Sequence, residues 1–348
     1  MFYHNVLKAH GDGISRTAVG NGHSTPKCRR DPMTETSPER SVLRSEVEVL
    51  ITGMPTPKWS PMQLFVSLQG RIKVVSIPSI IQSAIRDMGI MDIYHYLIDE
   101  ISDPRVSDWP LMSNPFGVIL ISLAYLSFVL YLGPLYMKKR KPYALIKTMI
   151  CYNIFVATAS AIIFYGLLTS GYTTHLSMGC EPFVISNDSM SLSMARWVWW
   201  VLILKITELA DTVIFIFRKK YNQISFLHVY HHTVTLFLAW ITCKYAPGGM
   251  WTFIMMPNCI VHVIMYIYYL CACLGPKMQK IVAPWKKYVT CLQLIQFTIM
   301  VIHTFQALLP SCEPTRKPLA YIYMSQVIIV FYMFLDYYRK SYLRKKTE

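Results

Sequence analysis

The chain has 348 residues, of which 53% are hydrophobic and only 15% are charged. Soluble domains carry about 25% charged residues, so this composition excludes an ordinary soluble enzyme and a disordered protein. The net charge of +15 could indicate nucleic-acid binding, but many basic residues lie in short clusters between apolar blocks, which is typical of membrane topology. We therefore expect a polytopic membrane protein without a nucleic-acid partner.

The first part of the chain differs from the rest. Residues 1–87 are rich in Ser, Thr, Pro, Gly and Arg and have no sustained helical period, which predicts a disordered N-terminal extension. They do not begin with the pattern of a signal peptide. Residues 88–115 are amphipathic and are expected to form a lumenal lead-in to the membrane domain.

Apolar blocks long enough to cross a bilayer begin at residue 116. Each is near the ~20 residues that the hydrocarbon core requires. They predict an all-α integral membrane protein with seven transmembrane helices in a domain over residues 116–338, followed by a basic tail, 339–348. The candidate spans are 116–136, 145–168, 195–217, 228–246, 251–273, 288–309 and 319–338.

The connectors between these spans are asymmetric in charge. Those after the first, third, fifth and seventh spans hold 17 Lys and Arg, and the alternate connectors hold 3. The positive-inside rule then predicts a cytosolic C-terminus and a lumenal N-terminus. Lys345 and Lys346, fourth and third from the end, fit a dilysine retrieval signal for the endoplasmic reticulum membrane, or simply add to the cytosolic charge.

Two cysteines lie in connectors that this topology places in the lumen. Cys180 and Cys312 can form a disulfide there because the lumen is oxidising; two free thiols are the alternative. Asn187 begins a glycosylation sequon in the same connector as Cys180. It lies only eight residues before the third span, so its use stays open.

Polar residues inside the spans are the candidate functional residues, because ionisable groups are costly in a bilayer and usually functional. The third span contains Lys205, Glu208 and Asp211. Lys205 and Glu208 are three residues apart and share a helical face. They are either a buried ion pair that fixes helix packing or part of a catalytic site.

The fourth span opens with three histidines, His228, His231 and His232. Their spacing of i, i+3 and i+4 places the imidazoles on one face. Such a box can bind metal, carry out acid–base or nucleophilic chemistry, or pack structurally.

The fifth and sixth spans carry two more polar stripes. Asn258, His262 and Tyr266 share one face of the fifth span, and Gln293 and Gln296 share a face of the sixth. The glutamines alone would also fit interhelical hydrogen bonding. In the predicted topology all these groups lie toward the cytosol, so we expect one polar chamber beneath the cytosolic face. The lumenal half of the bundle is almost entirely apolar, which suits a long hydrocarbon chain.

At these residues the chain resembles the ELO family of very-long-chain fatty acid elongases. The blocks KITELADT, HVYHH, NCIVHVIMYIYY and TCLQLIQ match the family's signature in type, order and spacing, and the resemblance runs from about residue 91 to the end. HVYHH, rather than HWYHH, is similar to the branch that handles longer and polyunsaturated chains.

The resemblance implies seven spans, six of them around a closed-ended acyl tunnel, and a Cys180–Cys312 bridge. It implies condensation of an acyl-CoA with malonyl-CoA to 3-oxoacyl-CoA, CoA and carbon dioxide, with no metal and no cofactor besides the substrates. It also implies that reductases and a dehydratase act as partners in an elongation cycle, and a homodimer is possible. His231 and His262 take the family's nucleophile-side positions.

Neutral imidazole can attack a thioester and hold the acyl group, which splits one difficult step into two. The hypothesis for this chain is His231 as acyl acceptor beside His262. His228 and His232 orient imidazoles or move protons. Of the remaining groups, Lys205, Gln293 and Gln296 are expected to stabilise oxyanions, and Glu208 and Asp211 to fix Lys205 and the histidines. Clustered cytosolic lysines attract the CoA phosphates.

Two other classes remain open. A di-iron desaturase or hydroxylase also uses HxxHH, but its metals need several histidine boxes, and only His303 lies in a span besides the four histidines above. A non-enzymatic seven-span lipid carrier would bind ligand without turnover, and it gives no reason for three imidazoles at the cytosolic mouth.

Overall fold

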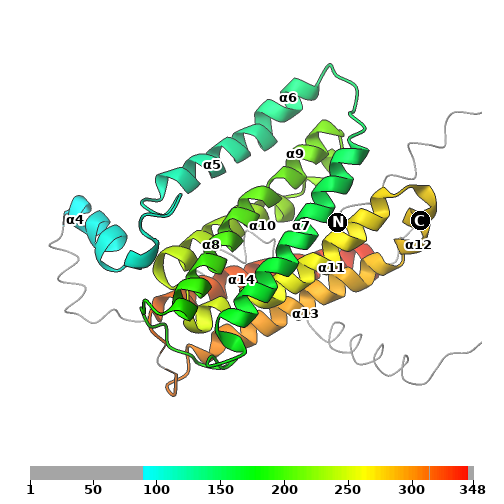
Figure 1. Ribbon diagram of the computed structural model, residues 1–348. Coiled ribbons are helices and arrows are strands. Elements are labelled where there is room, and N and C mark those ends of the chain that lie inside the picture. Colours follow the sequence, from blue (N-terminus) through cyan, green and yellow to red (C-terminus); the bar gives the residue numbers. More distant parts are fainter. Residues whose placement is uncertain (1–88, 313, 344–348) are drawn as a thin grey trace, which may run out of the picture. The chain divides into compact units, whose positions relative to one another are not determined.

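The computed structural model describes residues 89–312 and 314–343, and every regular element in these ranges is helical (Figure 1). The predicted extension, residues 1–87, and the dilysine pair, Lys345 and Lys346, lie outside the described residues.

Helices cover most of each of the seven ranges expected to span a membrane. The lead-in forms only short helical segments. One further short helix, α12, follows the fifth range, because Pro276 can begin a helix directly after Gly275, whose φ is 114°. In chain order the elements are α4 (Ile90–His95), η1 (Tyr96–Glu100), η2 (Pro104–Val106), α5 (Phe116–Ser127), η3 (Phe128–Leu132), α6 (Gly133–Met137), α7 (Ile146–Leu167), η4 (Leu168–Tyr172), α8 (Ser189–Glu208), α9 (Ala210–Phe217), η5 (Tyr221–Gln223), α10 (Phe226–Tyr245), η6 (Gly249–Thr252), α11 (Met255–Cys273), α12 (Pro276–Val282), α13 (Trp285–Gln306), α14 (Pro318–Tyr338) and η7 (Arg339–Leu343).

Within the described residues, five helical segments are long and apolar enough to cross a membrane. They are Phe116–Met137, Ile146–Tyr172, Gly249–Cys273, Trp285–Gln306 and Pro318–Leu343. The chain is therefore a multi-pass membrane protein. Helices α8 and α10 fall outside this set because the charged residues and histidines that they carry lower their mean hydropathy.

Two of the helices that carry predicted site residues begin with side-chain caps. The Asp188 carboxylate accepts hydrogen bonds from the N–H groups of Met190 and Ser191 at the start of α8. Hydrogen bonds from the Ser191 side chain and backbone hold the pKa of Asp188 below its ordinary value. The Ser225 hydroxyl accepts from the N–H of His228 at 3.2 Å. The cap therefore fixes the helix start immediately before the histidine box.

Six long helices contact one another in a closed circuit. Helix α7 packs along α11 and against α8, α8 against α10, α10 against α14, α14 against α13, and α13 against α11. Figure 1 shows α7, α11 and α13 running alongside one another. Gly166 lets α7 approach α8 closely, because a Cβ at this position would lie 2.0 Å from Cε2 of Trp197. Helix α5 lies outside this six-helix ring and contacts α10, and α6 contacts α9.

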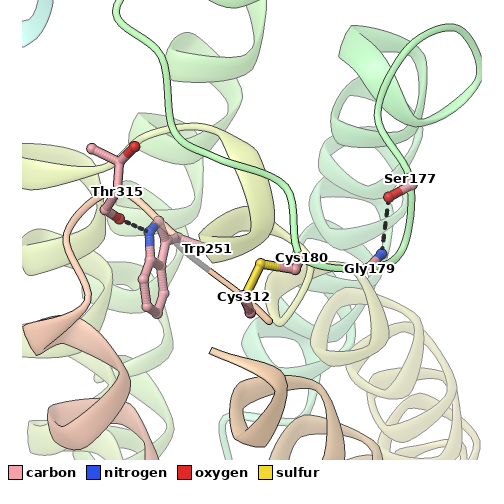
Figure 2. Close-up of a disulfide and its surroundings, with 6 residues drawn as sticks. All are labelled: Ser177, Gly179, Cys180, Trp251, Cys312 and Thr315. Carbon is pink, nitrogen blue, oxygen red and sulfur yellow. Dashed lines mark hydrogen bonds between the residues drawn. A yellow bond between two sulfur atoms is a disulfide. The ribbon is translucent and has the colours of Figure 1, made fainter. Parts of the chain in front are cut away.

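A disulfide and backbone contacts join three connectors at one end of the ring. Cys180 and Cys312 are bonded, with their Cα atoms 5.8 Å apart (Figure 2). The indole N–H of Trp251 donates to the carbonyl of Thr315 at 2.9 Å (Figure 2). Gly249 has a φ of 55°, and a Cβ there would lie 2.6 Å from the Pro182 carbonyl oxygen. A glycine is therefore needed where these two connectors meet.

The lead-in is anchored at the same end by buried polar groups. The Arg105 guanidinium pairs with Asp103 at 2.6 Å and donates to the carbonyl of Ser186 at 2.6 Å. The N–H of Asp103 donates to the carbonyl of Lys244 at 2.8 Å, and both side chains are buried. This end is thus less uniformly apolar than the sequence suggests, because a charged lead-in packs against it.

Candidate active site

A cavity of about 60 Å³ lies among the polar stripes of the long helices. Of the eleven predicted site residues, only Lys205 does not line it. The ten that do are His228, His231, His232 and His262, with Glu208, Asp211, Asn258, Tyr266, Gln293 and Gln296. Four sequence-separated motifs therefore meet in one chamber, which we call the histidine chamber.

Helical spacing explains why each element presents its polar residues to this chamber. Asn258, His262, Tyr266 and Tyr269 all line the cavity from α11, because their spacing keeps them on one face. A break at Leu209 separates α8 from α9 and lies between Glu208 and Asp211, both of which face the cavity.

A buried ion pair between Lys205 and Glu208 lies next to His262. The Lys205 ammonium donates to both oxygens of Glu208 at 3.0 Å, and the two side chains are 6% and 2% exposed. Nδ1 of His262 lies 3.0 Å from Oε1 of Glu208, although the two atoms do not form a hydrogen bond of standard geometry. The carboxylate therefore attracts a proton on Nδ1, which leaves Nε2 of a neutral imidazole unprotonated. Lys205 reaches the chamber only through Glu208.

The second acidic group is held by a tyrosine. The Tyr266 hydroxyl donates to Oδ2 of Asp211 at 2.7 Å, and both residues are buried. Hydrogen bonds to a carboxylate are about twice as strong as neutral ones. The bond therefore fixes α9 against α11 at the wall of the chamber.

The three box histidines have different surroundings. Nε2 of His228 lies 2.8 Å from the Thr212 hydroxyl, which in turn lies 2.9 Å from the Tyr125 hydroxyl. The His228 and His232 ring centroids are 4.3 Å apart, and both residues are buried. His231 is less buried, and its ring centroid lies 5.8 Å from that of His232. His231 is thus the most exposed of the three box histidines.

The glutamine amides on α13 have weak partners. Gln293 donates to the sulfur of Met265 at 3.4 Å, and Gln296 to the sulfur of Met300 at 3.5 Å. Thioether sulfur is a poor acceptor, so these amides can turn to a stronger acceptor such as a developing oxyanion.

Sequence reasoning missed several wall residues. Phe334 and Tyr337 line the chamber from α14, and Tyr125 on α5 is linked to the histidine box through Thr212. The aromatic cluster at the end of α14 was visible in the sequence, but aromatic residues at a membrane boundary ordinarily indicate an interfacial belt.

Among the described residues, no three His, Cys, Asp or Glu side chains are grouped so that they could hold a metal ion. The di-iron alternative therefore has no candidate ligand set in residues 89–312 and 314–343.

The fold and the chamber define a multi-pass helical membrane protein with a buried site built from histidines, carboxylates and amides. The model of the GNS1/SUR4 (ELO) family matches residues 110–348, which is more than half of the chain. The chain belongs to this family.

Named relatives agree with this membership. An Aedes aegypti very long chain fatty acid elongase is 40% identical over 260 residues, which cover 74% of this chain and 72% of the relative. Very long chain fatty acid elongase 7 of Drosophila melanogaster is 39% identical, covering 72% and 75%. Very long chain fatty acid elongase 1 of Mus musculus is 40% identical, covering 74% and 92%.

Proposed function

We propose that the chain is the condensing enzyme of fatty acid elongation, a 3-oxoacyl-CoA synthase that joins a long-chain acyl-CoA to malonyl-CoA. Family membership and relatives named as elongases support the reaction class. The observation that carries the proposal for this chain is that His231 and His262, from different helices, line one chamber. Two imidazoles in one cavity suit acyl transfer, which needs a nucleophile and a group that moves its proton.

In the first half-reaction, the unprotonated nitrogen of His231 attacks the thioester carbonyl. The carbon–nitrogen bond forms, the carbon–sulfur bond breaks, and CoA leaves as a thiolate that takes up a proton. The Glu208 carboxylate beside Nδ1 of His262 keeps that imidazole oriented so that it can accept the proton released from the His231 ring. Gln293 and Gln296 donate to the tetrahedral oxyanion.

In the second half-reaction, malonyl-CoA loses carbon dioxide and becomes an enolate. The enolate carbon attacks the acyl carbonyl, the new carbon–carbon bond forms, and the bond to His231 breaks. The imidazole is regenerated with a proton from solvent. The overall products are 3-oxoacyl-CoA, free CoA and carbon dioxide, and no step requires a cofactor besides the substrates.

The remaining expectations belong to the same proposal. Helices α8 and α10 complete seven spans with the five apolar segments, and the six-helix ring surrounds an acyl tunnel that continues from the histidine chamber and is closed at the end of the Cys180–Cys312 bridge. The protein lies in the endoplasmic reticulum membrane with its C-terminus in the cytosol. Reductases and a dehydratase process the product, the chain can form a homodimer, and HVYHH favours longer and polyunsaturated substrates.

Incubation of microsomes with labelled malonyl-CoA and acyl-CoAs of graded length tests the reaction. We expect label in chains two carbons longer, lost in His231→Gln and His262→Gln. His303→Gln provides a matched control, because His303 is buried on α13 and does not line the chamber. Absence of incorporation with every acyl-CoA, from correctly inserted protein, would overturn the proposal and favour the carrier.

A further inference from the structure

Helix α5 lies outside the six-helix ring, but one of its side-chain hydroxyls contacts a residue that is bonded to the histidine box. This helix belongs to the apolar segment Phe116–Met137, of whose most apolar stretch only 28% is buried. Most of the segment therefore faces outward. Tyr125 is an exception: it is 6% exposed, and its hydroxyl lies 2.9 Å from that of Thr212 on α9. A buried tyrosine hydroxyl needs a polar partner, and here the partner is Thr212, which in turn bonds His228 of the histidine chamber.

Thr212 behaves differently from other helical threonines in this chain. Thr207, Thr233, Thr242 and Thr298 each donate their hydroxyl to the carbonyl four residues earlier, at 2.7–3.0 Å. This is a common arrangement for threonine in helices. The Thr212 hydroxyl instead lies between the Tyr125 hydroxyl and Nε2 of His228 (2.8 Å).

We propose that Tyr125 is a positioning residue for the histidine box, because its hydroxyl holds Thr212 in the rotamer that bonds His228. This inference rests on the proposed function. The structure supplies the chain of contacts Tyr125–Thr212–His228 and the 4.3 Å packing of His228 on His232. The peripheral helix thereby fixes the orientation of two box imidazoles without contacting the substrate.

The alternative rotamer of Thr212 gives the effect its physical basis. Threonine in a helix divides between two χ1 rotamers because its hydroxyl can bond the preceding turn. Without the Tyr125 hydroxyl, Thr212 can turn to its own helix backbone and leave Nε2 of His228. The imidazole then loses the hydrogen bond that fixes Nε2, and this loss weakens the transition state more than the bound substrate.

We call the contacts Tyr125–Thr212–His228 the relay. Steady-state elongation by the purified full chain tests this relay with four variants. Tyr125→Phe and Thr212→Val should each lower kcat about fivefold to tenfold with little change in KM, as expected for loss of one net hydrogen bond. The double variant should fall no further than Thr212→Val alone. Thr212→Ser, which keeps the hydroxyl, should retain near wild-type kcat. Tyr131→Phe is the matched control, since Tyr131 is 67% exposed in the same segment.

A second readout does not depend on activity. Diethyl pyrocarbonate modifies unprotonated imidazole nitrogens, and the ratio of His228 to His231 modification can be measured by peptide mass spectrometry. We expect this ratio to rise severalfold in Tyr125→Phe and Thr212→Val and to stay unchanged in Thr212→Ser and Tyr131→Phe.

The two readouts separate the two ideas. If the wild type elongates but Tyr125→Phe leaves both kcat and the modification ratio unchanged, the relay is wrong and the proposed function stands. Additive losses in the double variant would also overturn the relay. If the wild type elongates no acyl-CoA, the proposed function fails, and the modification ratio alone decides whether Tyr125 positions His228.

Discussion

Replacing Lys205 by methionine leaves the Glu208 carboxylate in the protein interior without its cationic partner. The two groups are 3.0 Å apart and almost fully buried. At that distance an effective dielectric constant of about 20 gives an attraction of about 5 to 6 kcal/mol. Loss of one partner of a buried pair typically costs about 3 to 5 kcal/mol. Because His262 is also 3.0 Å from Glu208 and can take up a proton, we expect Lys205→Met to lose about 3 kcal/mol.

The assay is equilibrium unfolding in mixed micelles, with SDS as denaturant and tryptophan fluorescence as signal. The double variant Lys205→Met/Glu208→Gln removes both charges and should be more stable than Lys205→Met alone. It should nevertheless elongate no acyl-CoA, since His262 loses the carboxylate that orients it. A Lys205→Met loss below about 1 kcal/mol, or additive losses in the double variant, would refute the assignment of this contact as a stabilising buried ion pair.

Three further substitutions test other parts of the fold. Cys312→Ser should lower the free energy of unfolding by about 2 to 4 kcal/mol, because its bridge to Cys180 joins residues 132 apart in sequence. Asp188→Ala should lower the melting temperature at pH 7. The difference in stability between wild type and Asp188→Ala should shrink as the pH falls below 3.8, the ordinary pKa of Asp, because hydrogen bonds lower the folded-state pKa of Asp188. Gly166→Ala should cost about 1 to 3 kcal/mol, because its Cβ would lie 2.0 Å from Trp197.

The disulfide and glycine tests each have a control substitution. Cys151→Ser replaces an exposed free thiol and should leave unfolding unchanged. Gly179→Ala places a Cβ 3.4 Å from the Ser177 hydroxyl, an ordinary contact, and should be tolerated. Equal losses in test and control would contradict the packing and disulfide explanations. A stability difference between wild type and Asp188→Ala that does not shrink as the pH falls below 3.8 would contradict the capping explanation.

The polar chamber was predictable because helix periodicity decides which residues share a face. The spacing of His228, His231 and His232 places them together on α10, and the predicted topology places that face at the same depth as His262 on α11. The structure brings these groups into one cavity. Such residues can be found from sequence because their cost in a lipid environment leaves few explanations besides function.

Other features depend on tertiary contacts that the pattern does not contain. Lys205 shares a face with Glu208, yet it contacts the chamber only through that carboxylate. Tyr125 is one of three tyrosines in an apolar segment, with Tyr131 and Tyr136, and nothing local indicates that it is the one that contacts Thr212. Helix α12, with seven residues, is too short for a helical period to be recognised.

Trapping the acyl-enzyme tests whether His231 carries the acyl group during elongation. Purified protein is mixed with a radiolabelled long-chain acyl-CoA in the absence of malonyl-CoA, and CoA release and peptide-bound label are measured together. We expect one equivalent of CoA per active site and label on the peptide containing His231. The label should be absent in His231→Gln and should be chased into elongated product by malonyl-CoA. Elongation with both substrates, but neither CoA release nor bound label without malonyl-CoA, would contradict an acyl-histidine intermediate.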